Sequence, residues 1–198
     1  MNIISNSCCG AYLMRNHIKT EYINPFCWNV IDLKSYYYLI KNYASLDFLN
    51  YKLYKDENWN FSIILNDNIK IQYVHYLFDK NTIELTQKSE SESDILLWNK
   101  MWVYVVEKYV ERTKRMLQNN EPPIFIIADV KDNSDRKYDE FWLKKIDELE
   151  ISYKVILVSN HYSFNYKKSY KFTRCKNNCQ LSNFIFNNIL LNKDLFKI

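Results

Sequence analysis

The sequence predicts an α/β fold, a three-layer sandwich with a largely parallel sheet and an added β-hairpin. Two apolar runs of strand length, 124–128 and 153–158, lie between segments of helical periodicity, as is typical of strands buried on both faces. A third short apolar segment, 2–5, also runs directly into a helical pattern. Alternation of strand and helix along the chain indicates a layered α/β domain.

The length of 198 residues suits a single domain over 1–198, with a small C-terminal appendage from about residue 165 left open. Hydrophobic residues make up 47% and aromatic residues 17% of the chain, which favours a packed globule over a disordered chain. The net charge of +4 is spread out, and Lys167-Lys168 with Lys171 and Arg174 is the main local basic group. Without a clustered basic stripe, we expect no nucleic-acid partner.

The N-terminus lacks the basic region, apolar core and small-residue cleavage site of a signal peptide. Apolar runs stay well short of the ~18 residues that span a bilayer. The five cysteines are an odd number without secretory context, which favours reduced thiols. We therefore expect a cytoplasmic protein with no membrane span.

The first half of the chain opens with a strand over 2–5 and a helix over about 9–18. Pro25 makes 21–31 irregular, because the residue before a proline avoids helical geometry. Asp32 is then expected to cap a helix that runs to about residue 43. The segments 61–65 and 69–74, separated by Asn66-Asp67-Asn68, predict a β-hairpin, since these turn residues tolerate left-handed conformations.

The second half begins with a polar stretch, 79–93, that is expected to be a loop, and a long amphipathic helix follows over about 94–118. Its predicted apolar side consists of Leu97, Met101, Tyr104, Val105, Tyr109 and Met116. Pro122-Pro123 end this helix before the strand at 124–128. The remaining elements are expected to be a helix over 139–149, a strand over 153–158, a weak strand over 169–172 and a helix within 181–196.

Chemistry-bearing side chains follow the ends of three predicted strands: Cys8, Asp129 and His161. Ligands of open α/β sheets bind beyond the carboxyl ends of the strands, so these residues mark a candidate site. Cys8 and Cys9 also stand at the start of the first helix, beside Gly10, the only glycine in the chain. The field of a helix N-terminus favours the thiolate, so we expect a lowered pKa at this turn.

Three motifs, Ile4-Ser5-Asn6-Ser7-Cys8-Cys9-Gly10, Asn24-Pro25-Phe26 and Ile71-Gln72-Tyr73-Val74-His75-Tyr76, carry a resemblance to a known family. They resemble a bacterial family of domains of unknown function found in proteins assigned to exopolysaccharide biosynthesis. The resemblance covers about the first 160 residues. The chain departs from the family pattern on the long helix, where Leu97 precedes Trp98 in place of a lysine and Arg112 and Arg115 fall later. The layout is also similar to papain-like cysteine peptidases and, more distantly, to capsule-biosynthesis acyltransferases.

This resemblance implies a cysteine–histidine site made of Cys8 and His75. In such a site Cys8 is the nucleophile and His75 the general base. Backbone N–H groups at Cys9 and Gly10 would hold an oxyanion, and Asp129, or Asn6 as second choice, would orient the imidazole. Asn6, Cys9, Gly10 and His161 are the candidate substrate-binding residues.

Plainer interpretations of the same residues stay open. Cys8 also suits a small buried residue and His75 an ordinary strand-end histidine, and Cys9 is an alternative reactive thiol. Cys175 and Cys179 have the spacing of two metal ligands but lack a second pair in sequence, so no metal is expected. His161 also suits an exposed turn, and His17 suits a helix C-terminus.

The large apolar residues of the long helix, Trp98, Met101, Trp102, Val105 and Tyr109, resemble a sugar-stacking platform, but helical spacing of this kind is more typical of core. With one glycine, the chain has no phosphate-cradling fingerprint. The predicted function is therefore exopolysaccharide or glycoconjugate biosynthesis through a Cys–His acyltransferase or hydrolase. Its substrate would be a small molecule or glycan, with no required cofactor and acyl-coenzyme A as a conceivable donor. The alternative is a non-catalytic binding or assembly protein on the same scaffold.

Overall fold

The computed structural model describes residues 2–19, 24–27, 29–56, 61–73, 92–119, 121–129, 136–159, 169–171 and 178–191. Four of its strands form a parallel sheet in the order β1-β6-β7-β8. Their bounds are β1 Asn2–Ser5, β6 Pro123–Asp129, β7 Lys154–Ser159 and β8 Ser169–Lys171. The predicted α/β class and the parallel pairing of these segments are confirmed.

A second, antiparallel sheet has the order β2-β5-β4-β3. Its strands are β2 Asn29–Val30, β3 Tyr51–Lys55, β4 Phe61–Leu65 and β5 Ile69–Tyr73. The predicted hairpin is β4 and β5, whose register places Leu65 opposite Ile69. The sequence did not predict β2, which lies in the segment expected to be irregular, or β3.

Five α-helices are described: α1 Cys9–Leu13, α2 Leu33–Asn42, α3 Glu92–Gln118, α4 Arg136–Asp147 and α5 Asn178–Ile185. A π-helical turn continues α1 over Met14–Ile18, and another continues α5 over Phe186–Leu190. A short 3-10 turn, Tyr43–Ser45, follows α2. Asp32 caps α2 as predicted, since the Ser35 N–H donates to its carboxylate at 3.0 Å.

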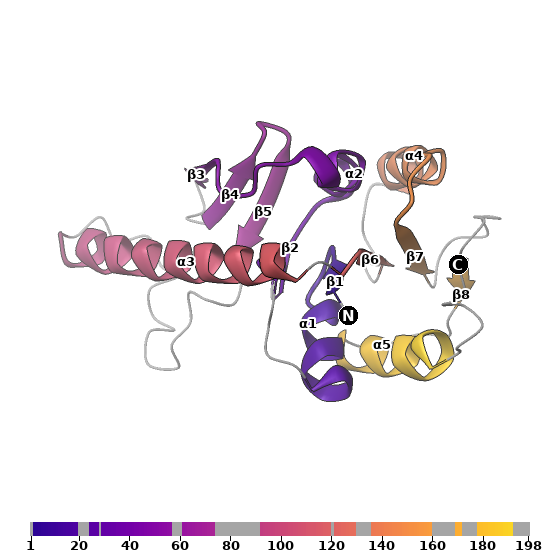
Figure 1. Ribbon diagram of the computed structural model, residues 1–198. Coiled ribbons are helices and arrows are strands. Elements are labelled where there is room, and N and C mark those ends of the chain that lie inside the picture. The colour runs from indigo at the N-terminus through magenta and orange to yellow at the C-terminus, as the bar shows by residue number, and fades with distance from the viewer. Residues whose placement is uncertain are drawn as a thin grey trace.

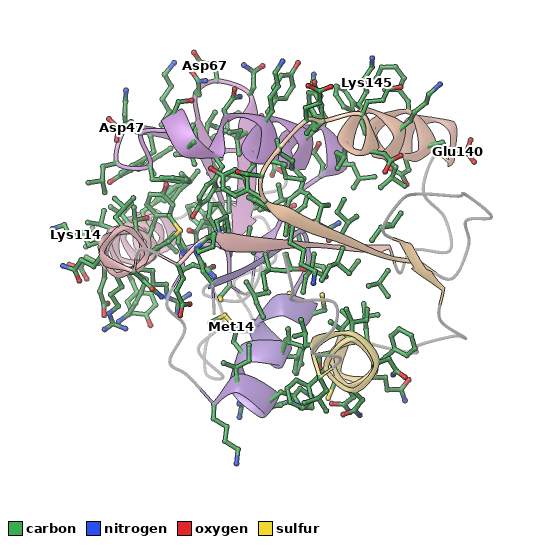
Figure 2. All side chains as sticks on the ribbon, turned by 45° about the vertical axis from the view of Figure 1, so that its right-hand side comes forward. Met14, Asp47, Asp67, Lys114, Glu140 and Lys145 are labelled. Carbon is green, nitrogen blue, oxygen red and sulfur yellow. The ribbon has the colours of Figure 1, made fainter. Side chains whose placement is uncertain are left out.

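Alternate residues of the parallel strands face opposite ways, and each face has its own helices (Figure 2). Ile4, Phe125 and Leu157 lie in a core shared with α2 and α4, and that core continues into the antiparallel sheet and α3. Ile3, Ile126 and Val158 lie in a core shared with α1 and α5. Figure 1 shows α2 and α4 side by side above the parallel sheet and α1 and α5 below it.

The long helix α3 supports the antiparallel sheet (Figure 1). Val105, Tyr109 and Met116 are buried in this core, and the Trp102 ring packs edge-on against Phe61 with centroids 4.1 Å apart. This confirms the core interpretation for these residues. Tyr104 was wrongly placed on the apolar side, because its side chain is 46% exposed. The side chains of Trp98 and Met101 lie outside the described residues.

Candidate site at the carboxyl ends of β1 and β6

The chain leaves β1 and β6 toward opposite faces of the parallel sheet. After β1 it enters α1, whose Leu13 packs in the core with α5. The helix after β6 is α4, whose Leu143 packs in the core with α2. Strands β1 and β6 are neighbours, so the helices that follow their carboxyl ends diverge to opposite faces of the sheet (Figure 1). In open α/β sheets, this is where the connecting loops part and ligands bind.

The turn that follows β1 is held by two serine hydroxyls. The Ser7 N–H donates to Ser5 Oγ at 3.3 Å, and the Cys9 N–H donates to Ser7 Oγ at 3.4 Å. Ser5 Oγ also lies 3.1 Å from Cys9 Sγ. Each serine thereby satisfies a backbone or thiol group that the start of α1 would otherwise leave without an internal partner.

Gly10 allows α1 to approach β1 closely. A Cβ at position 10 would lie 2.7 Å from the Cβ of Ser5, closer than two carbon atoms can pack. The single glycine of the chain therefore serves the contact between strand and helix, and its backbone conformation is ordinary, because no glycine has a positive φ. The carbonyl of Cys8 accepts from the Tyr12 N–H at 3.2 Å, so the turn passes directly into helix.

Asn6 joins the ends of β1 and β6 through its side chain. The Ala128 N–H donates to Asn6 Oδ1 at 2.8 Å, and Asn6 Nδ2 donates to the Ala128 carbonyl at 3.4 Å. The side-chain amide thus extends the parallel pairing one step beyond the last residue of β1. The backbone carbonyl of Asn6 accepts from the Ile31 N–H at 3.0 Å, which ties the same turn to the segment before α2. Asn6 was predicted to bind substrate or orient a histidine, and the structure gives its amide this structural pairing.

The pKa of Cys8 differs from the sequence-based expectation. Only 5% of Cys8 is exposed, and burial, with a smaller contribution from Cys9, raises its pKa to about 11. Burial also raises the pKa of Cys9, although hydrogen bonds from Ser5 and Ser7 oppose the increase. The prediction of a lowered pKa at this turn is wrong, because the loss of hydration outweighs the field at the start of a five-residue helix.

The other predicted site residues are only partly described. Asp129 ends β6 and pairs with Ser159 at the end of β7, as its predicted position after a buried strand requires. The side chain of Asp129 and the whole of His75, His161 and Cys175 lie outside the described residues. Among the described residues, Cys8, Cys9, Gly10 and Asn6 are therefore the predicted site residues that the structure brings together.

Tyr36 on α2 is a polar contributor that the sequence analysis did not identify. Its fully buried hydroxyl donates to the Ile4 carbonyl at 2.6 Å and lies 3.2 Å from the Ile126 carbonyl. The hydroxyl therefore bridges β1 and β6 at Ile4, two residues before Asn6. A tyrosine among apolar residues carries a polar tip that needs a partner when buried, and that was the available signal.

The other described cysteines and His17 lie in structural surroundings. Among the described residues, Cys8, Cys9, Cys27 and Cys179 form no disulfide. His17 contacts α5 and its π-helical continuation, with Nε2 2.8 Å from Asn183 Oδ1 and the ring stacked on Phe186 at 4.3 Å. Within the described ranges, no three His, Cys, Asp or Glu residues gather as metal ligands.

None of the helices in the described part of the chain is both long and apolar enough to cross a membrane. Comparison of the chain with protein-family models, with curated proteins and with solved structures found no match.

Proposed function

We propose that this chain is a cytoplasmic protein of exopolysaccharide or glycoconjugate biosynthesis that binds a small-molecule or glycan substrate beyond the carboxyl ends of β1 and β6. The observation that carries the proposal is the divergence of the chain from these two neighbouring strands to opposite faces of the sheet. The coverage of both faces by helices supports a three-layer sandwich as the complete architecture. The pathway rests on the resemblance of the Cys8–Gly10, Asn24–Phe26 and His75-Tyr76 motifs.

The burial of Cys8 favours binding as the primary role. A thiol with a pKa of about 11 is almost entirely protonated at neutral pH, and a protonated thiol is a poor nucleophile. Cys8 in the resting protein thus has the properties of a packed small residue. A non-catalytic binding or assembly protein needs no reactive thiol. It would bind its ligand at the carboxyl ends of β1 and β6, which the Asn6 side chain joins.

The second candidate is group transfer by Cys8, and the position of Cys8 directly after β1, where the following helices diverge, favours it. In this scheme the Cys8 thiol attacks the carbonyl of an acyl-coenzyme A thioester while His75 takes the thiol proton. The acyl–sulfur bond to coenzyme A then breaks, and His75 returns the proton to the departing thiolate. A sugar hydroxyl, or water in a hydrolase, next attacks the acyl-Cys8 and regenerates the thiol. Because the raised pKa of Cys8 leaves almost no thiolate at neutral pH, His75 has to remove the thiol proton while the sulfur attacks.

One experiment separates the two candidates. The protein is incubated with acetyl- or longer acyl-coenzyme A, and its intact mass is measured with and without an oligosaccharide acceptor. Group transfer predicts one added acyl mass that is lost in Cys8→Ser and kept in Cys27→Ser. Cys27 is the matched control, because it is also buried and its pKa is raised to about 12.

The binding role is tested by calorimetric titration with candidate sugars and sugar nucleotides. It predicts a titratable ligand without a mass change, and affinity reduced by Asp129→Asn but preserved in Cys27→Ser. Binding that is unaffected by substitutions along the β1–β6 edge would contradict the proposed site.

A further inference from the structure

We propose that two copies of this chain associate through antiparallel contact of their α3 helices. The buried side of α3 holds Val105, Tyr109 and Met116 and packs in the core with the antiparallel sheet. Another side of the helix has residues at intervals of three and four positions, which places their side chains along one line. This line, called the α3 stripe, consists of Val103, Glu107, Val110, Lys114 and Leu117.

The α3 stripe is open to solvent over most of its length. Val103 is 58% and Leu117 52% exposed, and these two apolar residues lie at its ends. Glu107 and Lys114 are exposed between them, and Val110 at the centre is half-buried. Figure 2 shows Lys114 on the side of α3 that is turned away from the two sheets. The stripe therefore alternates apolar and charged side chains at positions that a partner helix can reach.

The two charges of the α3 stripe are not used within the chain. The neighbouring charges form their own network, since Lys108 lies 3.1 Å from Glu111, which also pairs with Arg115. Within the described residues, neither Glu107 nor Lys114 forms an ion pair. They are seven residues apart, which exceeds the three- or four-residue spacing of ion pairs on a helix. Both charges are thus available to a second molecule.

The order of residues makes the α3 stripe complementary to itself when it is reversed. With a two-fold axis at Val110, Val103 meets Leu117 of the second copy, and Glu107 comes within one residue of Lys114 of the second copy. Each apolar contact and each ion pair then occurs twice. In a parallel pair, Glu107 would face Glu107 and Lys114 would face Lys114, so the charges select the antiparallel arrangement. This symmetry identifies the partner as a second copy of the chain, because an unrelated helix would not require it.

The length of the α3 stripe sets the strength of the association. From Val103 to Leu117 the stripe extends about 21 Å, or four helical turns. Contact over four turns of two helices is small compared with the interfaces of stable dimers, so we expect a weak dimer that forms as concentration rises. The ion pairs at its exposed surface align the helices more than they strengthen the contact.

The test is sedimentation equilibrium of the full chain from micromolar to millimolar concentration. We expect Glu107→Lys or Lys114→Glu alone to weaken dimerisation by roughly tenfold, since each turns two attractive contacts into two repulsive ones. The combined variant Glu107→Lys/Lys114→Glu should dimerise as the wild type does, because the exchange keeps opposite charges face to face. An equimolar mixture of the two single variants should form the heterodimer in preference to either homodimer.

The matched controls make the same charge changes on and after α4, with Lys144→Glu and Glu150→Lys. Figure 1 shows α4 at the other end of the molecule from α3. Both controls should dimerise as the wild type does, and circular dichroism of all variants should match because every altered side chain is exposed. A monomer at every concentration would overturn the proposal. Equal dimerisation of the wild type and both single variants, or failure of the combined exchange to restore it, would overturn it as well.

Discussion

A Cβ at Gly10 would lie 2.7 Å from the Cβ of Ser5, the last residue of β1. Ser5 Cβ is fixed to the strand backbone, so neither group can move aside without shifting β1 or α1. Helix propensity alone would predict that Gly10→Ala stabilises the protein by about 1 kcal/mol. The contact reverses the sign, and we expect Gly10→Ala to lower the free energy of unfolding by about 1–3 kcal/mol in urea denaturation.

A double-mutant cycle identifies the contact responsible. Ser5→Gly removes the opposing Cβ, so Gly10→Ala should cost less in the Ser5→Gly background than in the wild type. The single Ser5→Gly variant also loses the acceptor of the Ser7 N–H, and the cycle subtracts that common effect. Additive effects of the two substitutions would show that the strain lies elsewhere.

The amide of Asn6 is expected to stabilise the pairing of β1 with β6. Asn6→Ala removes both contacts with the Ala128 backbone and should lower the free energy of unfolding by about 1–2 kcal/mol. Asn6→Asp keeps an acceptor for the Ala128 N–H but places a carboxylate against the Ala128 carbonyl. We therefore expect its free energy of unfolding to be no higher than that of Asn6→Ala. Both variants are measured by urea denaturation at pH 7.

Asn188→Ala is the control for this comparison. Asn188 Nδ2 also donates to a backbone carbonyl, that of Phe184 at 2.9 Å, but at an exposed position where water replaces it. Its effect should stay within about 0.5 kcal/mol. A similar loss in Asn6→Ala and Asn188→Ala would contradict the role of Asn6 at the strand ends.

Local patterns in the sequence predicted the elements that have strong local signals. The apolar runs at β6 and β7 and the Asp32 cap of α2 depend on neighbouring residues, so they were identified. Strand β3 was missed because four of its five residues are exposed and it forms by pairing with β4. Strand β2 has two residues, and its pairing with Tyr73 is likewise a tertiary contact.

In the candidate site, too, features set by local sequence were predicted and features set by tertiary contacts were not. The position of Cys8 after β1 followed from the order of elements, but its pKa depends on burial by distant parts of the chain. The pairing of Asn6 with Ala128 joins residues 122 positions apart, and no local pattern indicates it. The sequence thus located the turn but not the electrostatic state of its thiols.

The tip of the β4–β5 hairpin offers a test of backbone strain. Asn66 and Asp67 have φ values of 49° and 55°, in the left-handed region that costs non-glycine residues free energy. Asp67→Gly should be more stable than Asp67→Ala by about 1 kcal/mol in thermal or urea denaturation. The exposed pair of Asp67 with Lys52 contributes little, and Asp67→Asn separates the loss of charge from the change in conformation. Equal stability of the glycine and alanine variants would contradict a left-handed residue at this position.

The raised pKa of Cys8 predicts how stability changes at alkaline pH. An unfolded thiol ionises near pH 8.5–9, whereas the folded protein holds the Cys8 proton up to about pH 11. The contribution of Cys8 is therefore fully present below pH 8.5 and is lost as pH rises toward 11, because only the unfolded state releases the proton in this interval. We expect Cys8→Ala and Cys8→Ser to lose less stability than the wild type between pH 8.5 and 10.5, measured by urea denaturation. The two variants should share this flatter slope even if their stabilities at pH 7.5 differ. Unchanged slopes would show that burial does not raise the pKa of Cys8, and rapid alkylation of native Cys8 by iodoacetamide at pH 7.5 would show a lowered pKa and favour the catalytic candidate.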